Sequence, residues 1–595
     1  MSSPHTGGLV SYAVKINGTE IPGAYPVHTL RIEQDINRIA TATLSILDGN
    51  PATESFTISA SSSFVPGNEV SIEAGYDGIN TLLFQGIVTQ QALRVDNVSG
   101  PLLEVECKDK AVKMTVGRKS SNFSASTDSD AIGQLIANAG LSAAVTATSV
   151  TLPTLIQYYA NDWDFIVSRA EANGLMVCTI NNQVSVFDPL ADTSVALTLT
   201  YGLDILAFNA QLNAINQVAQ VKASAWSFQD QQLVTVSTNN TLSGPGNLSS
   251  KTLAGVVGLS SYELQTSATE NNEELLCWAK AQMLKSELSK ITGQVRCLGN
   301  AQLLPGKYLT LEGLGARFDG DHFVSGVAHE ISDGSWFTEV SIGMSADWFT
   351  QKHHDIQAPS AAGLLPGTQG VFNGTVLKLF DDPDGEFRIL VEVALFNDNA
   401  TGLWARMANF YSTGGQGTFF LPEVGDEVIL GFLNQDPRFP VILGSLYSQK
   451  NKPFNQFSPN EKNSLKGIVS KSELRVMFDD ENKVLSLITP GNNSLLLDDQ
   501  HQQIEIKDQN GNSVVLSASG IVIKSPGDIS LQADGKLSLT GNTGVEIKSP
   551  GGDVQVQALN IKHSADMQFS ANGGATAQLE GAMQLTLKGA IVMIN

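Results

Sequence analysis

Alternating apolar and polar residues predict β-strands through most of the first 350 residues. Segments 10–16, 28–32 and 41–46 alternate with period 2, and turn sequences such as Asp77-Gly78 separate the strands. A strand with this pattern turns one face to a core and the other to solvent. The pattern predicts a first antiparallel β domain over 1–115 and a second β domain over 191–350.

Helical spacing interrupts this pattern in three places. Residues 129–140 and 161–174 carry apolar residues three and four apart, with Asn161 or Asp162 as a natural N-cap. A hairpin is expected to follow them across Asn181-Asn182, so 116–190 form a small α/β insert. A third helix is predicted within the second β domain, over 271–290.

The next region divides into a linker, a compact β module and a connector. Residues 351–369 are rich in Ala, Pro and Gly and have no periodicity, which indicates a linker. Five short strands follow within 370–450, a number that suits an OB-fold barrel better than a sandwich. Residues 451–500 are polar with a few short strands and form the connector.

The last part of the chain, 501–595, carries a repeat of eight residues. Apolar residues two apart recur at this spacing, slip once at Val554/Val556, and then resume. The pairs are Ile521/Ile523, Ile529/Leu531, Leu537/Leu539, Val545/Ile547, Leu559/Ile561, Met567/Phe569, Ala575/Ala577, Met583/Leu585 and Ile591/Met593.

Eight residues make one short strand and a turn, which is too little to close a core within one chain. Three chains can close it if each supplies one face of a triangular rod and the apolar pairs point to a common axis. The repeat therefore predicts a homotrimer, and the alternative is an ordinary β meander with coincidental spacing. The predicted trimer core consists of Ile521, Ile523, Ile529, Leu531, Leu537, Leu539, Val545, Ile547, Leu559 and Ile561.

Composition and charge narrow the possible functions. The chain has 36 Lys and Arg against 59 Asp and Glu, a net charge of −23, and only 16% charged residues. Nucleic-acid binding needs a basic, aromatic groove, and the acids of the barrel outnumber its cations, so no nucleic-acid partner is expected. The first residues lack a secretory signal pattern, and no apolar run is long enough for a transmembrane helix. Synthesis in the cytoplasm is expected.

Candidate catalytic and metal-binding residues are few, and we expect no catalytic residue, metal or cofactor. The sequence from His329 to Asp333 lacks the second His of a zinc motif, and 381–385 lacks the later ligands of an EF-hand. Asp479-Asp480-Glu481 is best explained as a solvated turn. His563 would occur three times in a trimer; an outward position is favoured, and an ion-binding ring stays open.

Three segments make the chain similar to the VgrG family and to fused hub-and-spike proteins of contractile injection systems. Residues 157–174, QYYANDWDFIVSRAEANG, resemble the family helix that ends in Glu and Gly before a strand. Residues 420–432 and 436–447 resemble its OB signature, FLPEVGDEVILGF and DPRFPVILGSLY. The repeat resembles its rod. The opening residues look most like spikes of extracellular systems, while a VgrG of a type VI secretion system stays an alternative.

The resemblance implies a mainly β fold: a hub of two barrel-like domains with the α/β insert, an OB barrel and a triple-stranded β-helix formed by the trimer. It implies a structural spike, not an enzyme, that couples an inner tube to a membrane-piercing needle. The implied partners are a hexameric Hcp-like tube protein, baseplate proteins and a PAAR-type tip protein. The tip would contact Ile591, Val592, Met593, Ile594 and Asn595.

Further consequences of the resemblance concern location and rival functions. The particle would be released or fired out of the cell, and the spike would meet a target membrane only on injection. One rival is a spike with a cell-wall-degrading domain, although residues 451–500 are too few to hold such a domain. A receptor-binding fibre is another rival, which the OB signature disfavours.

Overall fold

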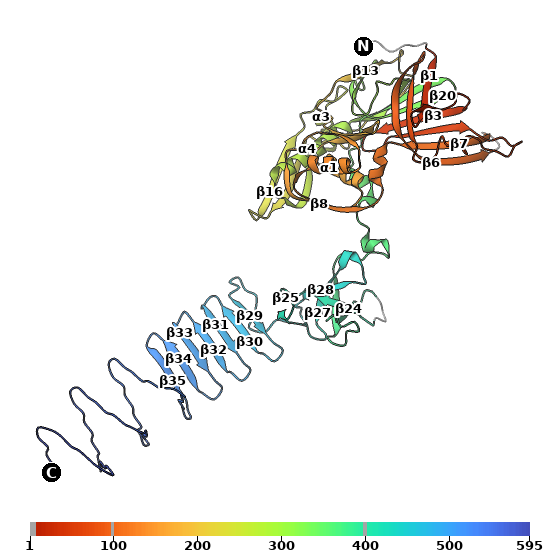
Figure 1. Cartoon of the computed structure of the whole chain (residues 1–595). Coiled ribbons are helices and arrows are strands. Elements are labelled where there is room, and N and C mark those ends of the chain that lie inside the picture. The colour runs from red at the N-terminus through yellow and green to blue at the C-terminus, as the bar shows by residue number, and fades with distance from the viewer. Residues whose placement is uncertain (1–7, 97–99, 270, 397–400, 595) are drawn as a thin grey trace. The chain divides into compact units, whose positions relative to one another are not determined.

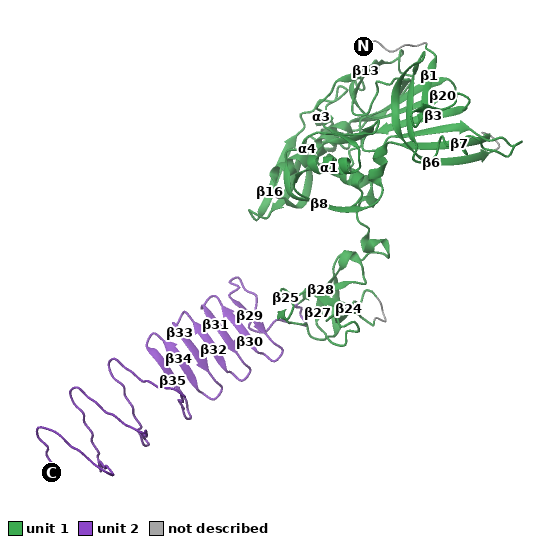
Figure 2. Cartoon of the chain, in the orientation of Figure 1, with its two compact units in different colours: residues 1–446 green, residues 447–595 purple. Residues whose placement is uncertain are grey.

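The computed structural model describes residues 8–96, 100–269, 271–396 and 401–594 (Figure 1). It divides into two compact units, Met1–Leu446 and Tyr447–Asn595 (Figure 2). Strands far outnumber helices in both units, which confirms the mainly β fold. No helix among the described residues is long and apolar enough to cross a membrane.

The largest element of the first unit is a 13-stranded sheet. Its main path runs β14-β18-β21-β20-β3-β4-β7-β6-β5-β1-β2, with β19 and β13 joined through β20. The strands are β1 (Val10–Ile16), β2 (Thr19–Glu20), β3 (Val27–Asp35), β4 (Thr41–Leu47), β5 (Glu69–Tyr76), β6 (Ile79–Asp96), β7 (Gly100–Lys108), β13 (Val195–Thr200), β14 (Ala207–Leu212), β18 (Ile291–Leu298), β19 (Tyr308–Glu312), β20 (Gly320–Ser332) and β21 (Ser335–Ile342).

This sheet joins the two β regions that were predicted as separate domains. β3 pairs antiparallel with β20, so that Ile32 lies opposite His329. Each half nevertheless keeps a core of its own, one around Leu30 and Leu44 and the other around Val295 and Leu309. The hub therefore has one continuous hydrogen-bonded sheet but two separate hydrophobic cores. The predicted domain boundaries stay predictions.

The strands of the hub follow the predicted alternation. In β3, Leu30, Ile32 and Gln34 point inward and are buried, while the residues between them reach solvent or lie at intermediate depth. Asp77 and Gly78 both have positive φ, 53° and 82°, as a two-residue type I′ hairpin turn requires. Local turn chemistry thus sets the β5–β6 register.

The insert contains η1 (Lys110–Thr115), β8 (Lys119–Thr127), α1 (Asp128–Asn138), β9 (Ser142–Val145), β10 (Thr151–Ala160), α2 (Asp162–Ala172), β11 (Met176–Ile180) and β12 (Gln183–Phe187). Both predicted helices are confirmed within two residues. Asn161 caps α2 by accepting a hydrogen bond from the Asp164 backbone N–H at 2.7 Å. The hairpin across Asn181-Asn182 is also confirmed.

A second α/β layer belongs to the second hub region. Its elements are β15 (Gln220–Ser227), β16 (Gln232–Asn239), α3 (Ser250–Val257), β17 (Tyr262–Thr269) and α4 (Asn272–Leu288). Ala223 and Ala225 of β15 pack with Ala279 and Met283 of α4. The predicted helix over 271–290 is confirmed, whereas α3, which is only eight residues long, was not predicted.

The predicted OB module is a closed barrel with the order β22-β23-β24-β28-β27, and this prediction is confirmed. Its strands are β22 (Phe372–Lys378), β23 (Ile389–Glu392), β24 (Leu403–Met407), β27 (Glu427–Phe432) and β28 (Pro440–Ser445). The other elements of this region are α5 (Phe349–Lys352), η2 (His354–Ile356), η3 (Ser360–Gly363), β25 (Ser412–Thr413), β26 (Gln416–Gly417) and η4 (Leu433–Gln435). Val376, Val391, Ala405 and Leu430 are fully or almost fully buried in the barrel core.

The second unit begins with a seven-stranded antiparallel meander, drawn in light blue in Figure 1. Its strands are β29 (Leu465–Val469), β30 (Arg475–Asp479), β31 (Val484–Ile488), β32 (Ser494–Asp498), β33 (Gln503–Lys507), β34 (Ser513–Ser517) and β35 (Gly520–Lys524). The sheet passes without a break through position 500, where a connector was expected to give way to the rod. Within one chain, 465–524 therefore pair as a meander, and 525–594 form no strand.

Candidate functional site: the apolar face of the C-terminal sheet

Two rows of apolar side chains cross one face of the meander. Residues two apart in a strand share a face, and the register places each pair directly opposite the next. One row is Ile468, Val476, Leu487, Leu495, Ile506, Val514 and Ile523, and the other is Phe478, Leu485, Leu497, Ile504, Leu516 and Ile521. We call these two rows the apolar ladder.

The opposite face of the meander is mixed and largely polar. Its cross-strand neighbours include Asp479, Asp498, Glu505 and Lys507. No second layer of the described chain covers the ladder, since Ile506 is 51% exposed and Ile521 is 69% exposed. A row of large aliphatic side chains left in water is unfavourable and marks an interaction surface.

Aspartates at or just beyond the strand ends, Asp479, Asp498 and Asp508, accept hydrogen bonds from the turns and hold the ladder in register. Asp498 accepts hydrogen bonds from the backbone N–H of His501 at 2.9 Å and from His501 Nδ1 at 2.8 Å. These bonds, the backbone bond first, hold the pKa of Asp498 below its ordinary value. Hydrogen bonds from Asn482 and Asn512 lower the pKa of Asp479 and Asp508 in the same way. A slip of one residue would move every ladder residue to the polar face, so fixed turns preserve the ladder.

The predicted trimer core continues the same pattern beyond the sheet. Ile521 and Ile523 are the last members of the ladder, and the eight predicted core residues after them are all exposed. The tip positions Ile591 to Ile594 are likewise exposed, and Asn595 lies outside the described residues. The part of the ladder before Ile521 was missed, because its apolar pairs recur at nine or ten residues instead of eight.

In the barrel, acidic side chains neutralise most of the cations. Lys378 pairs with Asp381 at 2.8 Å, Arg388 with Asp382 at 2.6 Å and Arg438 with Asp436 at 2.7 Å. Cations that are already paired within the chain are poor ligands for phosphate. The barrel surface therefore offers few free positive charges, although it exposes several aromatic side chains, among them Phe410 and Phe419.

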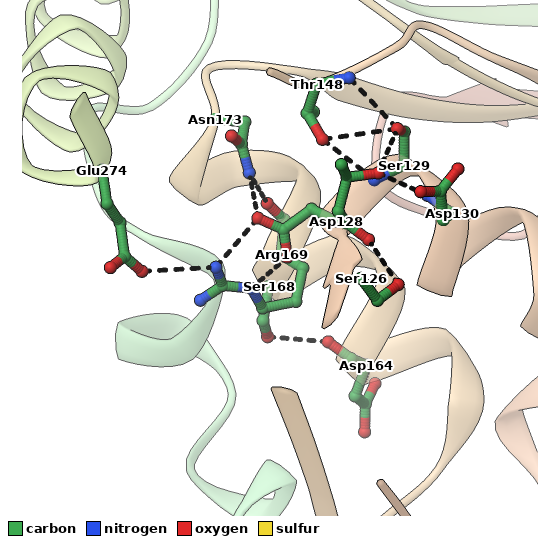
Figure 3. A network of polar contacts seen from close by, with 11 residues as sticks. Ser126, Asp128, Ser129, Asp130, Thr148, Asp164, Ser168, Arg169, Asn173 and Glu274 are labelled. Atoms are coloured by element: carbon green, nitrogen blue, oxygen red, sulfur yellow. Dashed lines mark hydrogen bonds and ion pairs between the residues drawn. The ribbon is translucent and has the colours of Figure 1, made fainter. Parts of the chain in front are cut away.

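The motif of residues 157–174 supplies ion pairs that connect α2 to α1 and to α4. Figure 3 shows Arg169 of α2 between Asp128 of α1 and Glu274 of α4. The Arg169 guanidinium donates to both carboxylate oxygens of Asp128, at 2.6 and 2.9 Å, and Asn173 donates to Asp128 at 2.8 Å. This bidentate pair ties the two insert helices to each other and to the base of α4.

A second ion pair of this motif is deeply buried. Lys285 of α4 donates to Glu171 of α2 at 2.7 Å and to the carbonyl of Asp347 at 3.0 Å, and both charged side chains are 4% exposed. The other Glu171 oxygen accepts from the backbone N–H of Phe349 at 2.7 Å. Burial lowers the pKa of Lys285. Sequence analysis missed this pair because its partners are 114 residues apart.

The residues considered for chemistry are dispersed. His329 is buried in the sheet with Nδ1 2.9 Å from Thr338 Oγ1, and burial lowers the pKa of His329 to about 4. The exposed His563 ring lies 6.0 Å from the ring of Phe569. In the part of the chain that the structure describes, no three His, Cys, Asp or Glu side chains gather as a metal site would require. The expected absence of catalysis and of cofactors stays a prediction.

Comparison with solved structures finds distant likenesses. A tail protein from Neisseria meningitidis MC58 is 16% identical, with 57% of this chain and 98% of that chain covered and a TM-score of 0.42. An E. coli type VI secretion component is 14% identical, with 73% and 99% covered and a TM-score of 0.38. A chain of the half-lidded Francisella PdpA-VgrG complex is 11% identical, with 87% and 88% covered and a TM-score of 0.37. Likenesses of this size establish nothing about function.

Family models give firmer results, while no curated protein matches. The model described as the type VI secretion system/phage-baseplate injector OB domain matches residues 372–447, which confirms the resemblance found at the OB signature. The model described as the Alg8 N-terminal domain matches residues 6–333, or 328 of the 595 residues. The chain therefore belongs to the family that is defined by the Alg8 N-terminal domain.

Proposed function

We propose that this protein is the structural spike of a contractile injection system and that it works as a homotrimer. The observation that carries the proposal is the uncovered apolar ladder, which continues into the eight-residue repeat. Three chains would bury these residues along a common axis, and residues 525–594, which form no strand within one chain, would pair as strands between chains. The match to an injector OB domain supports the same assignment.

In this proposal the function is mechanical. The hub binds a hexameric Hcp-like tube ring and baseplate proteins, the barrel links the hub to the rod, and the rod pierces the target membrane. Ile591 to Asn595 bind a PAAR-type tip protein, which would cover three apolar chain ends. The protein is not an enzyme, needs no cofactor and leaves the cell as part of the particle.

Light scattering on the purified full chain tests the proposal. A mass of three chains is expected, because a monomer would leave the ladder in water. A monomeric chain at micromolar concentration would overturn the trimer and, with it, the spike.

A lytic spike is the rival, and it has a separate test. The purified trimer is expected to leave peptidoglycan intact, because residues 451–500 are too few to hold a lytic domain. Release of soluble fragments from peptidoglycan would favour the lytic function. A type VI VgrG has the same mechanical role, so neighbouring genes for a membrane complex would distinguish it from an extracellular particle.

A further inference from the structure

A cavity of about 230 Å³ lies in the second hub region, beside the end of α4. Its apolar wall consists of side chains of α4, β18 and β20 that are at most 8% exposed, namely Leu284, Leu288, Ile291 and Phe323. The loop 242–245 and the exposed residues Leu190 and Thr193 form its rim. The cavity is thus enclosed by the hydrophobic core on one side and reached from solvent on the other.

One polar side chain in the wall has an atom without a partner. His322 of β20 is 1% exposed, and its Nε2 lies 2.7 Å from the carbonyl oxygen of Phe318. Because a carbonyl oxygen only accepts, Nε2 carries the ring proton. Burial lowers the pKa of His322, so the ring is neutral and its Nδ1 keeps a lone pair. Nδ1 is itself buried, and no donor among the described residues reaches it.

The other buried polar side chains of the wall already have partners. The Tyr308 hydroxyl donates to a backbone carbonyl at 3.1 Å. Glu287 accepts from Lys290 Nζ at 2.9 Å and from the backbone N–H of Gly244 at 3.0 Å. Of the buried side-chain nitrogens and oxygens that line the cavity in the described chain, only His322 Nδ1 lacks a partner. The cavity therefore offers one hydrogen-bond acceptor and no unpaired buried charge.

Polarity and size determine what the cavity can hold. An ion would lack a counter-ion, because Glu287, the buried charged residue of the wall, is paired with Lys290. A buried water makes about three hydrogen bonds, whereas a single acceptor is free here. An apolar cavity of about 150 Å³ accommodates benzene, so one of about 230 Å³ admits an aromatic ring with a small polar substituent. Because His322 is 1% exposed, a small diffusing molecule reaches it more readily than a side chain fixed to a folded partner.

We propose that this cavity binds a small, neutral aromatic molecule with one O–H or N–H group, of the size of phenol or indole. The ring packs against the leucines of α4 and against Phe323, and its O–H or N–H donates to His322 Nδ1. Binding is favourable because it gives a partner to a buried acceptor that is costly to leave unsatisfied. The inference goes beyond the mechanical function and places a ligand site within a single chain.

Isothermal titration calorimetry on the purified full chain tests the proposal with two probes of similar size, phenol and toluene. We expect phenol to bind at one site per chain. His322→Gln keeps a donor for the Phe318 carbonyl but has no acceptor at the position of Nδ1. The ratio of phenol affinity to toluene affinity should therefore fall about tenfold in His322→Gln and stay unchanged in His329→Gln, since His329 does not line the cavity. Absence of phenol binding, as for a cavity that takes only water, or an unchanged ratio in His322→Gln would overturn the proposal.

A second pair of variants tests the location of the site. Thr193→Trp narrows the rim and is expected to weaken phenol binding at least fivefold, whereas Ser194→Trp, one residue outside the lining, should bind phenol as the wild type does. Both side chains are exposed, so neither exchange disturbs the core. Equal phenol affinities of the two variants would overturn this location. The binding test does not depend on the oligomeric state, so a monomeric chain in light scattering would overturn the spike and leave the ligand site standing.

Discussion

The two units of the chain place their apolar residues in opposite environments. In the first unit Leu30, Ile32 and Leu44 are fully buried within one chain. In the second unit Ile521 and Ile547 are about 70% exposed, although both regions show a regular apolar pattern. The first unit can therefore be stable by itself, whereas the second has the pattern of a core without the other half of that core.

The largest expected effect is on assembly and comes from the second unit. Ile547→Asp would place three unpaired carboxylates at the proposed axis, so trimer formation is expected to be lost. Lys548→Asp introduces the same charge on the outward parity of the repeat and should leave the trimer intact. Light scattering measures both variants, and a trimeric Ile547→Asp would show that this residue is outside the core.

In the first unit the largest effect should come from the buried ion pair. Glu171→Ala removes the carboxylate that pairs with the buried Lys285, and we expect the free energy of unfolding of this unit to fall by about 3–5 kcal/mol. Glu33→Ala, which breaks an exposed pair with Arg31, should cost at most about 1 kcal/mol. Urea denaturation followed by tryptophan fluorescence provides the measurement, and equal effects of the two variants would contradict burial of the pair. Neither variant should change the oligomeric state.

The stability of the first unit should also depend on pH through His329. Burial lowers its pKa from 6.5 to about 4, so the unfolded chain takes up the proton first as the pH falls. The contribution of His329 is complete above pH 6.5 and falls by about 3 kcal/mol as the pH drops to 4. Urea titrations at several pH values should show a weaker pH dependence in His329→Gln. An unchanged dependence would mean that His329 is not the titrating group.

The smallest effect should come from the glycine that ends α2. Gly174 has a φ of 72°. A β-carbon added to Gly174 would lie 3.6 Å from the Ala281 Cα. Gly174→Ala should destabilise the first unit by about 1 kcal/mol. Gly255→Ala, in helical backbone of α3 with open space around it, should be neutral or stabilising in the same urea assay. If Gly174→Ala left the free energy of unfolding unchanged, the left-handed backbone conformation of Gly174 after α2 would be contradicted.

Local patterns were sufficient to predict much of the fold. The helices α1, α2 and α4 were predicted from spacing and caps, and the barrel from five short strands between turns. α4 shows a feature that local patterns did not predict. Its last two turns, from Ala281 to Leu288, are buried on all sides, so Lys285 and Glu287 do not mark a solvent-facing side there. Helical periodicity predicts which face of a helix is apolar. It does not predict that a polar residue such as Lys285 is buried beside a partner that is distant in the sequence.

The sequence by itself determined the β character, the caps, the turn at Asp77-Gly78 and the apolar pairs from Ile521 onward. These features depend on residues within about ten positions of one another, and their physical chemistry is local. Only the tertiary structure decided that β3 pairs with β20, that Glu171 meets Lys285, and that the apolar ladder begins at Ile468 instead of Ile521. Each of these contacts depends on a strand register or on a partner remote in the sequence, and the free energy of such contacts arises only after the chain has packed.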